Sequence, residues 1–187
     1  MRIGVFVVLA ALTLGGCTST PANDRAILDP RGNLNGDPTR TYMDILSASV
    51  GEEEGFYAFS VRAASRFPEP RDMAGGKRVD FIWFVDADRN KSTGQSANGN
   101  DYNLHLYLDE TGWHPMVAPV SEAAKKHGMS PLPTDCQFRV KGTTATLLVP
   151  AKALPASEFD WWVWSMTQNA PGWPPVTENP ATQHATF

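Results

Sequence analysis

Short apolar runs, separated by glycine, proline and charged residues, recur along most of the chain, and this pattern constrains the fold more than any other feature. The runs have the length of β-strands and several alternate apolar with polar side chains. They span residues 45–50, 56–62, 79–85, 102–108, 137–141, 144–149 and 159–166. The sequence therefore predicts an all-β fold, an antiparallel β-sandwich of jelly-roll-like form. A closed barrel is the alternative.

Three segments refine this prediction. The run 79–85 is apolar on both faces, which is typical of a central strand covered on both sides. The stretch GEEEG at 51–55 suits the turn of a hairpin between the runs before and after it. Only residues 121–128 have helical features, with Ser121 as N-cap and Gly128 as C-terminal stop, so we expect at most one short helix.

The N-terminal 17 residues have the layout of a secretory signal. A positive charge at Arg2 precedes the apolar stretch 3–14, which is shorter than the roughly 20 residues that span a bilayer. The residues before Cys17 are small, and LGGC at 14–17 resembles a bacterial lipoprotein signal, in which the cysteine becomes the first mature residue and carries a diacylglycerol. The alternative is an ordinary signal peptide that contains a cysteine by chance.

The lipoprotein reading fixes the expected organisation of the chain. Residues 1–16 are the signal peptide, 17–40 a lipidated and proline-containing tether, and 41–187 the β-sandwich domain. Thr18 stands where an aspartate would retain such a protein at the inner membrane, so we expect a bacterial cell-envelope protein anchored in the outer membrane. With Cys17 lipidated, Cys136 has no partner for an intramolecular disulfide. The formal net charge of −4 argues against a nucleic-acid partner.

The most informative loop is FVDADRNKSTGQSANGNDY at 84–102. Asp86, Asp88 and Asn90 present oxygens at alternate positions, as the start of an EF-hand does. The loop is not an EF-hand, because Lys91 stands where that motif requires glycine and Ala97 where it requires a bidentate glutamate.

A calcium ion could still bind in this loop, because calcium takes six to eight oxygens from any suitable arrangement. Asp101 and backbone carbonyls would join the three residues above, so the predicted ligands are Asp86, Asp88, Asn90 and Asp101. Alternatively, these are turn residues, and Arg89 or Lys91 neutralises the neighbouring carboxylates without a metal.

The same segment resembles extracellular β-sandwich domains related to family-nine carbohydrate-binding modules and DOMON domains. In these domains a strand ends in Asp-x-Asp-x-Asn, followed by Thr-Gly and by Gly-x-Asp-Tyr. The matching positions are Asp86, Asp88, Asn90, Thr93, Gly94, Gly99, Asp101 and Tyr102. MDILSASV at 43–50 and FDWWVWS at 159–165 are similar to the first and late strands of that group. The resemblance implies a β-sandwich with a structural calcium, whose ligand is a sugar, haem or unidentified.

A sugar site would need exposed aromatic rings. Alternation in FDWWVWS places Trp162 and Trp164 on one face, and His105 and Tyr107 share a face of another strand. These four residues are the predicted ligand-binding platform, and the alternative is that the tryptophans pack in the core.

Haem would need a pair of axial ligands. His105, His114, Met116 and Met166 are available, but no spacing singles out a pair, and we expect His114 and Met116 in a loop. The chain has no nucleophile elbow, zinc-protease motif or phosphate loop, and no catalytic residue is assigned.

The sequence thus predicts a lipid-anchored envelope module that binds carbohydrate and holds a structural calcium, and that contacts the membrane through its anchor. The alternatives are a haem-binding redox module of the same fold, and a structural or partner-binding lipoprotein without a small ligand.

Overall fold

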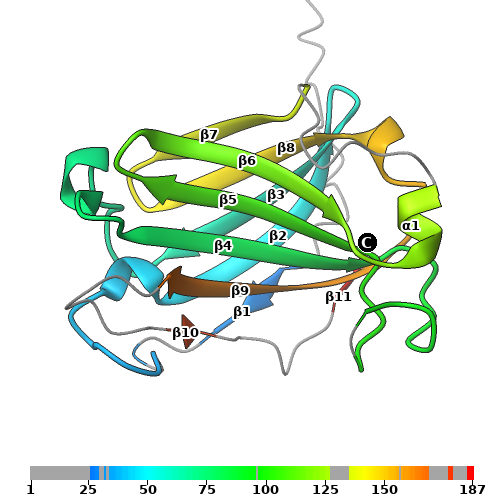
Figure 1. Cartoon of the computed structure of the whole chain (residues 1–187), viewed down its shortest axis with the longest axis horizontal. Helices are drawn as coiled ribbons and strands as arrows, with labels where there is room; N and C mark the ends of the chain where they lie inside the picture. The colour runs from blue at the N-terminus through cyan, green and yellow to red at the C-terminus, as the bar shows by residue number, and fades with distance from the viewer. Residues whose placement is uncertain are drawn as a thin grey trace, which may run out of the picture.

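Two antiparallel β-sheets face each other in the computed structural model, which describes residues 26–29, 32, 34–95, 97–126, 135–155, 157–168, 177–178 and 185–187 (Figure 1). The first sheet has the strand order β1 (Ile27–Leu28), β2 (Ile45–Glu53), β3 (Phe56–Ala63), β8 (Thr144–Pro150) and β7 (Gln137–Lys141). The second has the order β10 (Thr177–Glu178), β9 (Asp160–Gln168), β4 (Arg78–Asp86), β5 (Tyr102–Asp109) and β6 (Gly112–Pro119), with β11 (Ala185–Thr186) also beside β9. The predicted all-β, sandwich-like fold is confirmed.

Helical structure in the described residues is limited to short pieces. These are α1 (Glu122–Lys126) and the 3-10 turns η1 (Thr41–Met43), η2 (Pro70–Met73) and η3 (Ala151–Ala153). Ser121 caps α1 as predicted, because its Oγ accepts a hydrogen bond from the backbone N–H of Ala124 at 3.0 Å. The predicted stop at Gly128 lies outside the described residues. None of the described helices is long and apolar enough to cross a membrane.

Alternating side chains of both sheets form the core. Tyr57, Phe59 and Val61 of β3 are buried, as are the apolar residues on the inner face of the facing sheet. From that sheet come Val79, Phe81, Trp83, Val85, Leu104, Leu106, Leu108, Trp161 and Val163. Phe59 contacts Trp83 at a centroid distance of 6.2 Å, which joins the two layers. Strand β4 pairs with β5 on one side and with β9 on the other, and it ends at Asp86.

The hairpin between β2 and β3 is tighter than the predicted GEEEG turn. The strands pair up to Glu53 and Phe56, which leaves Glu54 and Gly55 as the turn. Both residues have positive φ, 48° and 84°, as a type I′ turn requires. Glu52 and Glu53 of the GEEEG stretch therefore lie on β2, and Glu54 lies in the turn.

Two features of the chain differ from the prediction. His114 and Met116 lie on strand β6 and not in a loop. Pro115 and Pro119 hid this strand in the sequence, but β6 is the last strand in the described sheet order, and an edge strand tolerates proline. The five-stranded sheet also begins before residue 41. Its strand β1 lies within the expected tether, pairs with β2 and buries Ile27.

Candidate metal centre and outer sheet face

The end of β4 and the start of β5 bring three carboxylates together. Asp86 is the last residue of β4, and Asp101 precedes β5, which pairs with β4. The backbone N–H of Asp101 donates to the carbonyl of Val85 at 2.7 Å, and the N–H of Ala87 donates to Asp101 Oδ2 at 2.9 Å. The loop therefore returns its last aspartate beside its first.

Asp86, Asp88 and Asp101, here called the carboxylate cluster, each present one oxygen, and these atoms lie within 4.8 Å of one another. Asp86 is 1% exposed and Asp101 is 3% exposed, whereas Asp88 is exposed. Asp86 Oδ2 and Asp101 Oδ1 are buried and have no hydrogen-bond partner among the described residues. Unpartnered buried carboxylate oxygens are costly, and a cation bound between them would remove that cost.

The electrostatics of Asp86 reflect this crowding. The pKa of its carboxyl is raised to about 6, mainly by burial and also by the neighbouring Asp88 and Asp101. The backbone N–H of Asn90 acts in the opposite direction, because it donates to Asp86 Oδ1 at 3.1 Å and lowers the pKa. One backbone N–H does not offset burial beside two other acids.

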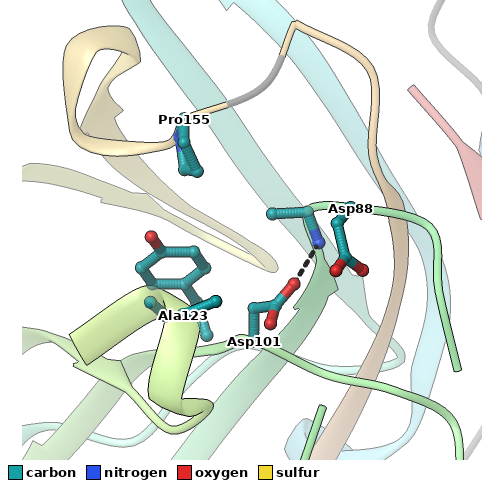
Figure 2. A pocket seen from close by; sticks show the side chains of 7 residues that line it. Asp88, Asp101, Ala123 and Pro155 are labelled. Atoms are coloured by element: carbon teal, nitrogen blue, oxygen red, sulfur yellow. Dashed lines mark hydrogen bonds between the residues drawn. The ribbon is translucent and has the colours of Figure 1, made fainter. Parts of the chain in front are cut away.

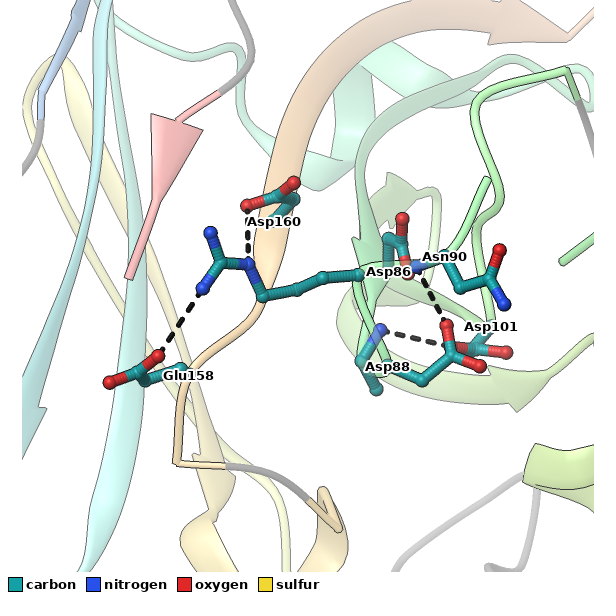
Figure 3. A network of polar contacts seen from close by, with 8 residues as sticks. Asp86, Asp88, Asn90, Asp101, Glu158 and Asp160 are labelled. Atoms are coloured by element: carbon teal, nitrogen blue, oxygen red, sulfur yellow. Dashed lines mark hydrogen bonds and ion pairs between the residues drawn. The ribbon is translucent and has the colours of Figure 1, made fainter. Parts of the chain in front are cut away.

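Arg89 does not neutralise the cluster, although it lies within the same loop. Its Nη1 donates to Glu158 Oε2 at 3.3 Å, and its Nε lies 3.5 Å from Asp160 Oδ1, as Figure 3 shows. Lys91 is exposed and forms no ion pair within the described part of the chain. The cationic partner in the turn interpretation is therefore missing from the described residues.

Asn90 takes part differently from the aspartates. Its backbone N–H also donates to Asp88 Oδ1 at 2.9 Å. Its side-chain Oδ1 accepts hydrogen bonds from the N–H of Ser92 at 3.1 Å and the hydroxyl of Ser92 at 2.6 Å. The structure thus brings together the carboxylates of three predicted ligands, while the amide oxygen of the fourth is engaged by Ser92.

Two glycines allow the loop to fold back on itself. A Cβ on Gly94 would lie 1.9 Å from the carbonyl carbon of Gly99, and Gly99 itself has a φ of 80°. Next to them, the hydroxyl of Thr93 donates to Asp88 Oδ2 at 2.8 Å and holds that exposed carboxylate in place. The contacts within the loop thus explain why threonine and glycine stand at these positions of the Thr-Gly and Gly-x-Asp-Tyr elements.

A pocket of about 300 Å³ adjoins the carboxylate cluster. Its walls come from the loop, the start of β5, α1 and the turn after η3; the residues are Ala87, Asp88, Asp101, Tyr102, Ala123, Ala124 and Pro155. Figure 2 shows Asp88 and Asp101 on one side and Ala123 and Pro155 on the other. This pocket could not be predicted from the sequence, since α1 and Pro155 approach the loop only in the folded chain.

The four predicted platform residues share the outer face of the six-stranded sheet, with β4 between their strands. Ile82 of β4 pairs with Trp164 on one side and with His105 on the other. Trp164 is 36% exposed, and it meets Phe84 edge-on at a centroid distance of 5.0 Å. Trp162 is 1% exposed and stacks on Phe84 at 5.3 Å. Trp164 is thus the tryptophan of β9 that offers ring surface to a ligand.

His105 and Tyr107 belong to a polar network on the same face. The carboxylate of Asp80 lies 3.2 Å from His105 Nδ1 and accepts a hydrogen bond from Arg78 at 2.7 Å. The Arg78 guanidinium also covers the ring of Tyr107 at 3.5 Å, and Tyr107 stacks on His114 of β6. Both predicted residues are therefore held in fixed positions, with their rings partly covered by neighbours.

One pair of the candidate haem ligands, His105 and Met116, has a geometric difficulty. His105 and Met116 are direct cross-strand neighbours on one sheet face. Axial ligands must approach iron from opposite sides of the ring plane. Two adjacent side chains on one flat face do not provide that arrangement.

Sequence reasoning missed Asn100, which precedes Asp101. It is 2% exposed, its Nδ2 donates to Asn103 Oδ1 at 2.7 Å, and its Oδ1 has no partner in the described structure. Its only signal was its position as the variable residue of the Gly-x-Asp-Tyr element.

Cys17, the predicted lipidation site, lies outside the described residues. Comparison with protein-family models, with curated proteins and with solved structures finds no match to this chain.

Proposed function

We propose that this protein is a calcium-stabilised binding module of the cell envelope, with carbohydrate as its ligand class. The observation that carries the calcium part is the carboxylate cluster, in which three oxygens lie within 4.8 Å of one another and two buried oxygens have no partner among the described residues. Oxygens bound to calcium at about 2.4 Å are at most about 4.8 Å apart, so the separations fit one shared ion.

The donor set favours a hard cation such as calcium over a soft transition metal. The cluster contains only oxygen ligands from carboxylates, which suit hard cations, and no cysteine or histidine belongs to it. Calcium would supply the positive charge that the cluster lacks, because Arg89 pairs with Glu158 and Asp160 instead. Bound there, the ion would hold the end of β4 to the start of β5.

A melting experiment tests the calcium proposal. Calcium that binds only the folded state stabilises it by about 2.7 kcal/mol at a hundredfold excess over Kd, which raises Tm by about 5–10 °C in a domain of this size. Magnesium should act less, because it demands a smaller octahedral shell. Asp88→Asn should weaken the response by removing one charge from the shell.

The control for this experiment is protein shown by elemental analysis to be free of metal. A Tm of that protein that stays the same with calcium and with chelator would decide for a turn without a metal, and added salt would then shift Tm slightly by screening the exposed charges.

The carbohydrate part is supported by the outer face of the six-stranded sheet. Trp164 is exposed there, beside Ile82 and in line with His105. An indole face stacks on the C–H face of a pyranose, while neighbouring polar groups bond the hydroxyls. Asp80 and Arg78 fix His105 and Tyr107 in position, which lowers the entropic cost of binding.

Tryptophan fluorescence tests this face. Soluble polysaccharides should quench the emission, and Trp164→Ala should abolish binding with little effect on Tm. Phe138→Ala is the matched control, because Phe138 is an aromatic residue with 40% exposure on β7 of the other sheet. Equal loss of binding in both variants, or binding that survives in Trp164→Ala, would exclude this face as the ligand site.

Anchoring at Cys17 completes the proposal. Lipidation requires the sulfur, and several acyl chains hold a protein stably because each buried methylene adds about 0.8 kcal/mol. Cys17→Ser should leave soluble protein or uncleaved precursor in a fractionation experiment. Unchanged processing and membrane partitioning would disprove the anchor.

A further inference from the structure

The pocket of about 300 Å³ next to the carboxylate cluster has the features of a second ligand site. We propose that it binds the terminal residue of a neutral glycan through two neighbouring hydroxyl groups that coordinate the calcium ion of the cluster. This inference rests on the calcium part of the proposed function. It is separate from the outer sheet face, because Trp164, His105 and Tyr107 do not line the pocket.

The pocket shares part of its wall with the carboxylate cluster. Asp88 and Asp101 belong to the cluster and also line the pocket, whereas Asp86 does not line it. Calcium takes six to eight oxygens, and three carboxylates leave part of its shell to other donors. Figure 2 shows that Asp88 and Asp101 both lie at the pocket wall, so a ligand in the pocket would supply those oxygens from between these two residues.

Tyr102 provides a second, independent sign of a ligand. The residue is fully buried, lines the pocket, and its hydroxyl has no hydrogen-bond partner within the described ranges. Buried hydroxyls without partners are rare because their desolvation is not repaid. A sugar hydroxyl can accept from or donate to the Tyr102 oxygen, so the same ligand would satisfy both the tyrosine and the ion.

Charge and shape indicate a neutral sugar. Three carboxylates and one divalent ion leave an excess of negative charge, which repels an anionic ligand. The remaining walls are the small apolar side chains of Ala87, Ala123, Ala124 and Pro155, which suit the C–H face of a pyranose. Ligand pockets begin at about 300 Å³, so this one accommodates a single residue at the end of a chain.

Calorimetry with methyl α-D-mannopyranoside, which presents adjacent cis hydroxyls, tests the proposal. Calcium is titrated first, and the glycoside is then titrated into calcium-loaded and calcium-free protein. We expect heat of binding only in the calcium-loaded sample. Ala123→Phe places a large ring in the pocket from an exposed position of α1. Because the ring occupies the space of the glycoside, affinity should fall by about tenfold or more.

Two further variants make the result specific. Lys126→Phe adds the same ring to α1 at an exposed residue that does not line the pocket, and it should bind as the wild type does. Tyr102→Phe removes only the hydroxyl; glycoside affinity should fall by about five- to tenfold, as for one lost hydrogen bond, with calcium affinity unchanged.

The outcomes separate this proposal from the proposed function. Failure of calcium to bind would remove both. Calcium binding without glycoside binding, equal glycoside binding in calcium-free protein, or full binding in Ala123→Phe would overturn the pocket proposal and leave the calcium site intact. Tighter binding of methyl glucuronoside than of the neutral glycoside would overturn the assignment to a neutral sugar.

Discussion

Two acidic regions near turns of this chain have opposite electrostatic environments. At the β2–β3 hairpin, Glu53 accepts two hydrogen bonds of 2.7 Å from the guanidinium of Arg139, and this contact lowers its pKa. At the β4–β5 loop, Asp86 faces Asp88 and Asp101, and burial raises its pKa to about 6. A cluster of acidic residues in a sequence therefore indicates a metal site only when the carboxylates are buried and the nearby cationic side chains pair with other groups.

The largest expected difference between the two regions concerns their glycines. Gly94→Ala places a Cβ 1.9 Å from the Gly99 backbone, so the free energy of unfolding should fall by about 3 kcal/mol as the loop shifts. Gly55→Ala, at a φ of 84° with no atom within 4 Å of the added Cβ, should cost about 1 kcal/mol. Urea denaturation of both variants measures the contrast. Equal losses of the free energy of unfolding in the two variants would mean that the β4–β5 loop accommodates the added methyl group.

The second test neutralises one acid in each region, in calcium-free protein. Asp86→Asn removes a buried charge that two other carboxylates repel and should stabilise the fold by about 1 kcal/mol, while abolishing the response to calcium. Glu53→Gln breaks the pair with Arg139 on the exposed surface and should lower Tm slightly, with the calcium response retained. Effects of the same sign on calcium-free Tm would contradict the comparison.

The third test uses pH. In calcium-free protein the Asp86 carboxyl keeps its proton up to about pH 6, whereas an unfolded aspartate releases it near pH 4. The folded state therefore binds more protons between these values, and its stability rises as the pH falls from 7 to 5. Relative to Asp86→Asn, the wild-type Tm should increase over this range by about 2–4 °C for each kcal/mol gained. A Tm difference independent of pH would contradict the raised pKa.

The smallest expected effect comes from Arg89→Gln. Arg89 pairs with Glu158 and Asp160 at the surface, and such pairs contribute less than about 1 kcal/mol. The rise of Tm with calcium should be unchanged, because Arg89 does not neutralise the cluster. A large loss of stability in calcium-free protein, restored by calcium, would instead identify Arg89 as the counter-charge of the cluster.

Local patterns predicted a strand well where alternation was clear, as in 102–108, because side-chain direction on a strand depends only on position. Strand β6 was not predicted, since its prolines obey a rule about sheet edges that requires knowing the strand order. Alternation also placed Trp162 and Trp164 on one face, but their different exposure depends on neighbours along and across the sheet.

The candidate site, like the strands, was predictable only where residues close in the sequence determine it. Asp86, Asp88 and Asp101 could be expected near one another, because the loop leaves one strand and enters the next. The engagement of Arg89 could not be, since Glu158 and Asp160 lie about 70 positions further along the chain. The pocket likewise needs α1 and Pro155, two distant segments.

The pairing of β1 with β2 has a mechanical consequence for a chain held by its N-terminus. A pull from Cys17 would reach the sandwich first at Ile27 and Leu28, which form a two-residue pairing at the edge of the five-stranded sheet. Because β1 pairs with β2 over only two residues, we expect it to open under load before the longer pairing of β2 with β3. Each residue released from β1 would add about 3.5 Å to the extended chain before β2, so under the proposed anchor at Cys17 the opening of β1 would lengthen the tether.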